Sequence, residues 1–511
     1  MNEIHPKFYP GAHLPELAEK PAVILAETGE QLTYAELDAY ANRVGRLYRS
    51  IGLQEAEHVA YYVENRLDCI GLQWGAHYVG LYYTFINTRL KASEVIYILE
   101  NCEAQVLVVS AATAGEIVDA VSTLANPPKI YCLDEFDGLE LFSAACAGQD
   151  SSPLKGTTEG NEMLYSSGTT GTPKGVKPYM TQQPLGTTCV QAGLLSNGFG
   201  MDSDSIYLSP APFYHAAPLK WSKGVIALGG TVVLMQKFRA LEALQAIETY
   251  AITHSQWVPT MFSRMLALSS DERARFDLSS HKLAIHAAAP CPIPIKQAML
   301  EWWGPIVAEY YSCTELIGMT KASPEDWMKK PGTVGRAIFG VIRIIDDTGE
   351  ECAVGNDGLV YFSDGQKFSY HKDEIKTREA YNEKGWATVG DIGHVDADGF
   401  LYLTDRKSNM IISGGVNVYP QEVENLLISH PKIFDAAVIG TPHHDLGEEV
   451  RAVIQLKDGV EPNDALKEEL INYTRDHLSH IKCPRVIDFS ESLPREPNGK
   501  MLKRLLKERY H

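Results

Sequence analysis

The chain contains no long hydrophobic run. No uninterrupted apolar stretch approaches the roughly 18 residues that a membrane-spanning helix needs. The first residues lack a basic segment followed by an apolar one, so no secretory signal is expected. The nine cysteines form no CxxC pair and no His/Cys cluster at zinc spacing. This scarcity excludes a disulfide framework and favours a reducing compartment, so we expect a cytoplasmic location.

Positive charge is also scarce. Lys and Arg number 46 against 65 Asp and Glu, a net charge of −19. This balance argues against nonspecific binding to nucleic acid or anionic membrane, so local cations must meet any anionic substrate. Apolar residues (45%) and charged residues (22%) are typical of a globular protein. Because 511 residues exceed what one core usually organises, two to four domains are expected.

Short apolar segments that alternate with amphipathic helices predict an α/β fold with a largely parallel sheet. A capping box at Thr33-Tyr34-Ala35-Glu36 opens a helix that ends near Gly52. Beyond residue 330, strands separated by Asp/Gly turns indicate a β-rich subdomain, and the last hundred residues have a small α+β pattern. We predict an N-terminal domain over 1–405 and a small, mobile C-terminal domain over 406–511.

The segment from Ser166 to Lys174 combines five hydroxyl side chains and two glycines ahead of one lysine. Consecutive amides in glycine turns hold anions, hydroxyls add donors, and Lys174 supplies a full charge, so the segment predicts a polyphosphate-binding loop. Its spacing fits neither the common phosphate loop nor the dinucleotide fingerprint. The alternative is a flexible Ser/Thr/Gly linker.

Tyr311, Thr314 and Glu315 lie within five residues of each other. They could stack a base, touch a phosphate and hold Mg²⁺, since magnesium needs only one or two carboxylates when nucleotide phosphates are present. The alternative is an ordinary strand-to-helix junction.

Two later segments carry further candidates. Asp391 could accept from both hydroxyls of a ribose, and Arg406 could donate to the same sugar. Their alternatives are a turn residue and a surface ion pair of Asp405 with Arg406. Pro and Asn-Gly make a turn that presents Lys500, whose alternative is a solvated tail.

These four segments, in this order, resemble the adenylate-forming superfamily, in its branch of acyl-CoA synthetases and AMP-dependent ligases. The resemblance covers nearly the whole chain and includes Asn87-Thr88-Arg89-Leu90, Met410-Ile411-Ile412-Ser413-Gly414-Gly415 and Val418-Tyr419-Pro420-Gln421-Glu422. It implies a ligase with ATP, Mg²⁺ and CoA as cofactors and co-substrate. Such an enzyme activates a carboxylic acid to an acyl-adenylate and passes the acyl group to CoA.

The resemblance also implies residue roles. The loop that holds the ATP phosphates would be Ser166, Ser167, Gly168, Thr169, Thr170, Gly171 and Lys174. Ala288 would bind the cofactor, Tyr311 would stack on adenine, Thr314 would reach the α-phosphate, and Glu315 would bind Mg²⁺. Asp391 and Arg406 would hold the ribose, and Lys500 would bridge the carboxylate and the α-phosphate.

For the second step, the resemblance implies rotation of the C-terminal domain about Ser408, a position where Asp or Lys is common. Gly414 and Gly415 would then line the thiol tunnel, and His215 would gate or orient between this tunnel and the acid pocket. The pocket would be lined by Tyr214, His215, Trp221, Trp257, Val258 and Ala287. The alternatives are a buried packing histidine at position 215 and core positions for Trp221 and Trp257. Ala287-Ala288-Ala289 replaces the Gly-Gly-Ala of many relatives, and its apolar surroundings favour a fatty, aromatic or cyclic acid.

Three hypotheses about the function remain open. The first is the acyl-CoA ligase, a second transfers the acyl group to an amine or a free carrier protein, and a third is a non-catalytic nucleotide-binding protein. The expected partners are the acid and CoA, with no nucleic acid and no transmembrane segment. A homodimer is compatible with the sequence.

Overall fold

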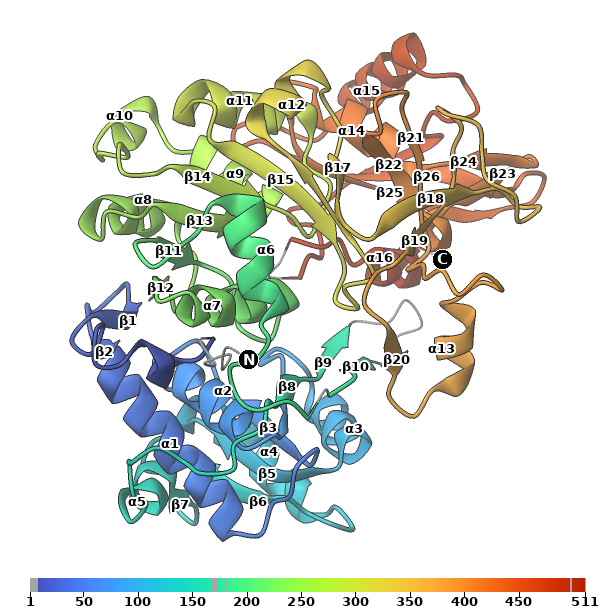
Figure 1. The fold of residues 1–511 in the computed structure, drawn as a ribbon. Coiled ribbons are helices and arrows are strands. Elements are labelled where there is room, and N and C mark those ends of the chain that lie inside the picture. Colours follow the sequence, from blue (N-terminus) through green and yellow to red (C-terminus); the bar gives the residue numbers. More distant parts are fainter. Residues whose placement is uncertain (1–7, 167–172, 181, 497–498, 511) are drawn as a thin grey trace. The chain divides into compact units, whose positions relative to one another are not determined.

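The computed structural model describes residues 8–166, 173–180, 182–496 and 499–510 (Figure 1). The chain divides into two compact units, one of residues 1–257, 268–285 and 367–379, the other of residues 258–267, 286–366 and 380–511. Each unit has its own hydrophobic core. The predicted domain boundary between residues 405 and 408, with its hinge at Ser408, stays a prediction.

The first unit begins with a six-stranded parallel sheet in the order β7-β6-β5-β3-β4-β8. Its strands are β3 (His58–Tyr62), β4 (Tyr82–Phe85), β5 (Ala104–Val109), β6 (Lys129–Cys132), β7 (Glu140–Leu141) and β8 (Asn161–Glu162). The accompanying helices are η1 (Pro10–His13), α1 (Tyr34–Ser50), α2 (Asp68–Tyr78), α3 (Ala92–Cys102), α4 (Ala111–Ser122) and α5 (Phe142–Ala147). Side chains of β3, β5, α3 and α4 form one core cluster.

Helix α1 begins where the capping box predicts. The Thr33 side chain accepts from the Glu36 amide at 3.2 Å, and the Glu36 carboxylate accepts from the Thr33 amide at 2.8 Å. These reciprocal bonds satisfy two amides that have no partner within the helix. The local sequence therefore fixes this helix start.

Six further strands, in the order β14-β13-β11-β12-β1-β2, belong to the nine-stranded sheet of the chain. These strands are β1 (Pro21–Leu25), β2 (Gln31–Thr33), β11 (Ile206–Ser209), β12 (Thr231–Leu234), β13 (His254–Trp257) and β14 (Leu283–His286), whose last residue belongs to the second unit. The helices here are α6 (Val190–Phe199), α7 (Ala216–Ala227), α8 (Ala240–Thr249) and α10 (Ser270–Arg273). The pairs of β12 with β1 and β11, and of β11 with β13, are parallel, as the alternation of strands and helices predicts.

A small antiparallel sheet completes the first unit. It consists of β9 (Leu164–Ser166), β10 (Lys174–Pro178) and β20 (Phe368–Tyr370), with α13 (Glu374–Glu379) following β20. The sequence did not reveal that a segment near residue 370 pairs with the strands that flank the Ser/Thr/Gly loop.

The second unit contains the predicted β-rich part. An antiparallel run β17-β16-β15 consists of β15 (Val307–Ser312), β16 (Met319–Ala322) and β17 (Arg336–Phe339). A four-stranded antiparallel sheet in the order β18-β19-β21-β22 consists of β18 (Val341–Ile345), β19 (Gly358–Ser363), β21 (Asp391–Val395) and β22 (Leu401–Arg406). Its helices are α9 (Pro259–Leu266), α11 (Ile293–Trp303) and α12 (Pro324–Lys329).

The last hundred residues, orange to red in Figure 1, form the predicted small α+β arrangement. They comprise η2 (Lys407–Asn409), β23 (Ile411–Ser413), β24 (Val416–Val418), α14 (Pro420–Ile428), β25 (Ile433–His443), β26 (Gly447–Leu456), α15 (Asp464–His477), β27 (Val486–Phe489) and α16 (Lys503–Tyr510). Helices α14 and α15 bury their apolar faces on β25 and β26. Within the described part of the chain, every helix is too short or too polar to cross a lipid bilayer.

Candidate active site

Three predicted residues of the second unit form one hydrogen-bonded group. Asp391 begins β21 and lies opposite Arg406, the last residue of β22. The Arg406 Nε donates to Asp391 Oδ1 at 3.1 Å, and the Tyr311 hydroxyl, near the end of β15, donates to Asp391 Oδ2 at 2.6 Å. Burial and this carboxylate raise the pKa of Tyr311 well above its ordinary value. The two bonds orient a buried carboxylate whose remaining lone pairs can accept sugar hydroxyls.

The Asp391–Arg406 pair corrects one interpretation of the sequence. The alternative paired Arg406 with its neighbour Asp405 at the surface. Instead Asp391 raises the pKa of Arg406 above its ordinary range. Sequence adjacency favours Asp405, but adjacent side chains on a strand point to opposite faces, and the cross-strand partner is Asp391.

Glu315 and Lys500 complete this site. Glu315 is 7% exposed and follows β15. Burial lowers the pKa of Lys500, and Arg406 lowers it further, while Glu496, Asp391 and Glu315 oppose the shift. Lys500 therefore lies within electrostatic range of three predicted nucleotide-site residues. The arrangement places one cation and one carboxylate beside the oriented Asp391, as a site for a phosphate-bearing ligand requires.

Lys500 is held on a tight hairpin. The amide of Glu496 donates to the Lys500 carbonyl at 2.9 Å, and the amide of Gly499 donates to the Glu496 carbonyl at 2.8 Å. Gly499 has a φ of +80°, and a Cβ there would lie 2.9 Å from Thr260 Oγ1 and 3.6 Å from Val258 Cγ2. Glycine thus lets the backbone approach the start of α9. The solvated-tail alternative for Lys500 is wrong, because the residue is half-buried and its backbone is hydrogen-bonded within the hairpin.

The predicted phosphate loop belongs to the first unit. Ser166 and Lys174 are paired in register at the base of the β9–β10 hairpin, and Lys174 Nζ lies 5.4 Å from the centre of the Tyr370 ring. Ser167, Gly168, Thr169, Thr170 and Gly171 lie outside the described residues. The pairing shows that the loop joins two adjacent strands; its contact with phosphate stays a prediction.

The predicted acid-pocket residues of the first unit are packed among aromatic rings. Tyr214 and His215 directly precede α7, with ring centres 4.6 Å apart. Trp221 packs against Phe199 at 4.9 Å. The Trp257 indole donates to Ser255 Oγ at 2.5 Å. Both tryptophans are buried, so they belong to the core, and their role as pocket walls stays a prediction.

The pocket residues of the second unit include one unusual backbone. Val258 and Ala287 are 6% exposed, whereas Ala288 is exposed and has a φ of +74°. This left-handed conformation costs a residue with a Cβ roughly 1–2 kcal/mol, and such strain clusters at functional sites. The strain explains why glycine suits this segment, although alanine stands here.

The hinge segment is anchored by a residue to which the sequence analysis gave no functional role. Ser408 lies in η2, directly after β22. Asp405 accepts from Asn409 Nδ2 at 3.0 Å and from the amide of Gln421 at 2.9 Å, which ties this segment to the start of α14. An Asp 15 residues before a Pro-initiated helix gives no recognisable motif.

Gly414 and Gly415 form the turn between β23 and β24. Their φ values are +56° and +80°, which favour glycine. Within the described residues, a Cβ at 415 would meet no atom within 4 Å. The backbone conformation therefore requires these glycines, and the space beside Gly415 is compatible with the predicted thiol tunnel.

Comparison with known proteins decides the family. The AMP-binding enzyme family matches residues 13–369, and the AMP-binding enzyme C-terminal domain matches residues 422–500. The chain belongs to the AMP-binding enzymes.

Several relatives of this AMP-binding enzyme are named as acid–CoA ligases. The long-chain-fatty-acid–CoA ligase FadD13 of Mycobacterium tuberculosis is 30% identical over 495 residues, which cover 96% of this chain and 95% of the relative. The anthranilate CoA ligase AuaEII, solved with anthranoyl-AMP, has a TM-score of 0.86 and 25% identity over 99% of this chain and 98% of its own. ATP-bound MatB from Rhodopseudomonas palustris has a TM-score of 0.85 and 26% identity over 99% of both chains.

These findings confirm the predicted superfamily, the α/β fold with a separate C-terminal α+β part, and the activity class of an acid-activating ligase that uses ATP and CoA. The individual residue roles are not tested by similarity.

A buried ion pair involves the strand that carries Tyr311, and this pair was not predicted from the sequence. The fully buried Lys296 donates to Glu309 at 2.6 Å, and His286 Nε2 lies 3.4 Å from the same carboxylate. Burial lowers the pKa of His286, with Lys296 as a second cause, so the imidazole is neutral. The pair connects α11 to β15, two residues before Tyr311. A Glu inside an apolar strand was the available signal.

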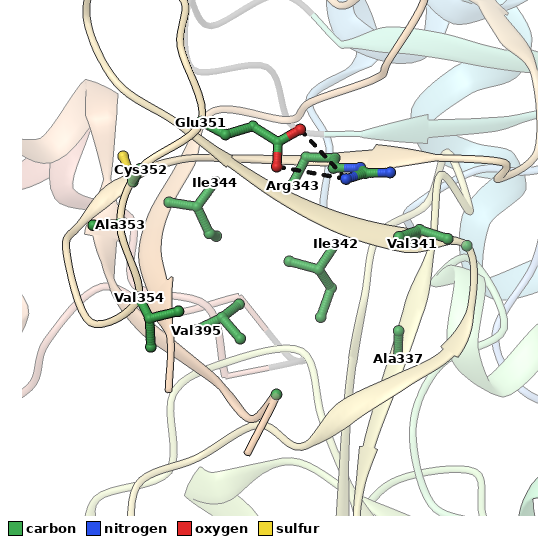
Figure 2. Close-up of a pocket in the computed structure, with 12 residues that line it drawn as sticks. Ala337, Val341, Ile342, Arg343, Ile344, Glu351, Cys352, Ala353, Val354 and Val395 are labelled. Carbon is green, nitrogen blue, oxygen red and sulfur yellow. Dashed lines mark hydrogen bonds and ion pairs between the residues drawn. The ribbon is translucent and has the colours of Figure 1, made fainter. Parts of the chain in front are cut away.

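Figure 2 shows a separate pocket of about 370 Å³ in the β-rich part. Its wall is mainly apolar, with Ile342, Ile344, Val354 and Val395 pointing toward it, and Arg343 and Glu351 pair across one side at 3.3 Å. Among the described residues, no predicted site residue lines this pocket. It is therefore distinct from the residues assigned to nucleotide and acid.

The donor set fits a nucleotide-dependent magnesium site. The described residues contain no group of three or more His, Cys, Asp or Glu side chains that could hold a metal ion. Mg²⁺ at Glu315 would therefore need the phosphates of ATP among its ligands, which is the usual arrangement for this ion.

Proposed function

We propose that this AMP-binding enzyme is an ATP-dependent acyl-CoA ligase that acts on a hydrophobic carboxylic acid and releases AMP and pyrophosphate. The observation that supports it is the position of Lys500 within range of Glu315, Asp391 and Arg406. These residues come from distant segments, and each is of the type that nucleotide chemistry needs. The names of the relatives give the same reaction class.

In the first step, Asp391 and Arg406 hold the ribose while Tyr311 and the segment at Ala288 flank the adenine. Thr314 contacts the α-phosphate, and Glu315 would hold Mg²⁺ together with the phosphates, whose charge the ion would offset. A carboxylate attacks an anionic phosphorus poorly, so Lys500 offsets the repulsion as the bond to pyrophosphate breaks. The loop from Ser166 to Lys174 holds the leaving phosphates.

In the second step, the CoA thiol attacks the acyl carbon and AMP leaves. We propose that residues 406–511 rotate about Ser408 between the two steps. The rotation withdraws Lys500 and brings Gly414 and Gly415 toward the pantetheine, with His215 between the tunnel and the acid. The anchoring of this segment by Asp405 supports a defined pivot.

The apolar surroundings of Val258, Ala287 and the two tryptophans support a fatty, aromatic or cyclic acid. We further propose a cytoplasmic location, which the nine free cysteines support. The homodimer stays a prediction, which sedimentation measures directly.

One assay tests the function. Purified protein is incubated with ATP, Mg²⁺ and a panel of fatty, aromatic and cyclic acids, with and without CoA, and products are read by mass spectrometry. Acyl-CoA is the expected product. Acyl-AMP that accumulates despite CoA would show another acceptor, such as an amine or a carrier protein. If none of the acids gives acyl-AMP, the result would favour a non-catalytic nucleotide-binding protein.

A further inference from the structure

Arg495 and Asp435 link the hairpin that carries Lys500 to strand β25. Arg495 Nε donates to Asp435 Oδ2 at 2.7 Å, and its Nη2 donates to Asp435 Oδ1 at 2.7 Å. The third nitrogen, Nη1, donates to the carbonyl of Gly499 at 2.6 Å. The guanidinium therefore links the residue directly before Lys500 to strand β25. A bidentate arginine fork of this kind fixes direction as well as distance.

Further contacts hold Asp435, the base of this link. Asp435 follows a register irregularity at the start of β25, and its Oδ1 also accepts from the amide of Ala436 at 2.9 Å. The side chains of Arg495 and Asp435 are 24% and 14% exposed, so solvent competes little for the pair. Leu493 and Leu506, on either side of the hairpin, are buried against the same strand.

The position of the Lys500 backbone matters because the lysine ammonium is carried on a flexible four-carbon side chain. A backbone bridge between Arg495 and Met501 closes the hairpin. The arginine fork adds a side-chain link to β25 at the carbonyl next to Lys500. Displacing a catalytic group by about 1 Å can cost 10²-fold in rate.

We infer that Arg495 and Asp435 are positioning residues that aim Lys500 during adenylation. The inference rests on the proposed function, because it assigns Lys500 to the first step. The pair is not expected to serve thioester formation, in which Lys500 has no role. The two half-reactions therefore separate this role from a structural one.

The test measures both half-reactions in the full-length protein. Adenylation is followed by acid-dependent ATP–pyrophosphate exchange, and thioester formation by the reaction of supplied acyl-AMP with CoA. We expect Arg495→Gln to lower adenylation about 10- to 100-fold, the range of a misplaced catalytic group. Thioester formation should change by less than about threefold, the usual context-dependent variation. Arg495→Lys should not restore adenylation, because an ammonium cannot form the fork.

A matched control is available in the same domain. Arg451 pairs with Asp488 at 2.7 Å between β26 and β27, with side chains 20% and 32% exposed. Arg451→Gln removes a similar ion pair and should leave the ratio of the two half-reactions unchanged. Thermal unfolding of every variant reports whether it folds, and Asp435→Asn provides a second variant should Arg495→Gln fail to fold.

The double variant Arg495→Gln, Lys500→Ala decides the mechanism. If Arg495 acts through Lys500, the double variant adenylates no more slowly than Lys500→Ala alone, since residues that act as a unit are not additive. A further loss in the double variant, or equal losses in both half-reactions of Arg495→Gln, would overturn the inference. Wild-type protein that catalyses neither half-reaction would instead refute the proposed function.

Discussion

Among single residues, Lys500 is the sharpest test of the first half-reaction. Removal of one preorganised donor to developing charge typically costs about 10²–10³ in rate. We therefore predict that Lys500→Ala lowers acid-dependent ATP–pyrophosphate exchange by this factor, while thioester formation from supplied acyl-AMP is largely kept. Equal losses in both reactions would contradict the rotation about Ser408.

The lowered pKa of Lys500 predicts a pH dependence. Burial and Arg406 favour the neutral amine, so at a given alkaline pH a larger fraction of Lys500 is neutral than for an exposed lysine. The rate of adenylation at low ATP should therefore fall with rising pH at a pH below the ordinary lysine value of 10.5. Lys500→Arg keeps its charge at every accessible pH. This variant should be slower but should lose the alkaline decline; a decline at the same pH in both proteins would assign it to another group.

At the scale of elements, the β21–β22 pair sets the ribose site. The pair contains a register irregularity between Ile392 and Gly393, two residues from Asp391. A Cβ at Gly393 would lie 2.2 Å from the backbone oxygen of Tyr402, so the strands could not keep their separation.

We predict that Gly393→Ala raises the KM for ATP about tenfold or more, because it shifts Arg406 relative to Asp391. The control is Gly115→Ala, where a Cβ on α4 would meet no atom of the described residues within 4 Å. Alanine is favoured over glycine in a helix by about 1 kcal/mol, so this variant should keep its activity and unfold no more easily. An unchanged KM for ATP in Gly393→Ala would show that the register of these strands does not control nucleotide binding.

For the whole molecule, buried histidines predict acid sensitivity. Burial lowers the pKa of His58 and His281 to about 3, and that of His254 to about 4. Below the unfolded value of 6.5 the unfolded chain binds protons that the folded chain does not, so stability is lost as pH falls toward 4. At pH 5, each of these histidines lowers the free energy of unfolding by roughly 2 kcal/mol.

The unfolding temperature measured from pH 7 to pH 5 tests this prediction. His58→Gln removes one titrating group and should flatten the decline, whereas the exposed His480→Gln is the control and should not. An unfolding temperature that is constant over this range would show that the three histidines do not control acid stability.

Local sequence determined much of the fold. The capping box at Thr33 fixes the start of α1, and Pro420 fixes that of α14, because both signals act within one turn. The short β9–β10–β20 sheet escaped prediction, because its third strand comes from a segment about 190 residues away. Non-local pairing of short strands leaves no periodicity to read.

The sequence by itself determined the family and the chemical types at the site, because glycines, hydroxyls, carboxylates and a lysine in fixed order suffice to identify the reaction. Only the tertiary structure decided their partners. The strand register pairs Arg406 with Asp391 and not with its sequence neighbour Asp405. Likewise, the packing of β25 gives the hairpin of Lys500 an anchor in Asp435, 60 residues from Arg495. The physical reason is that side-chain identity is local, whereas the distances and burial that set charge and direction arise only when remote strands pack together.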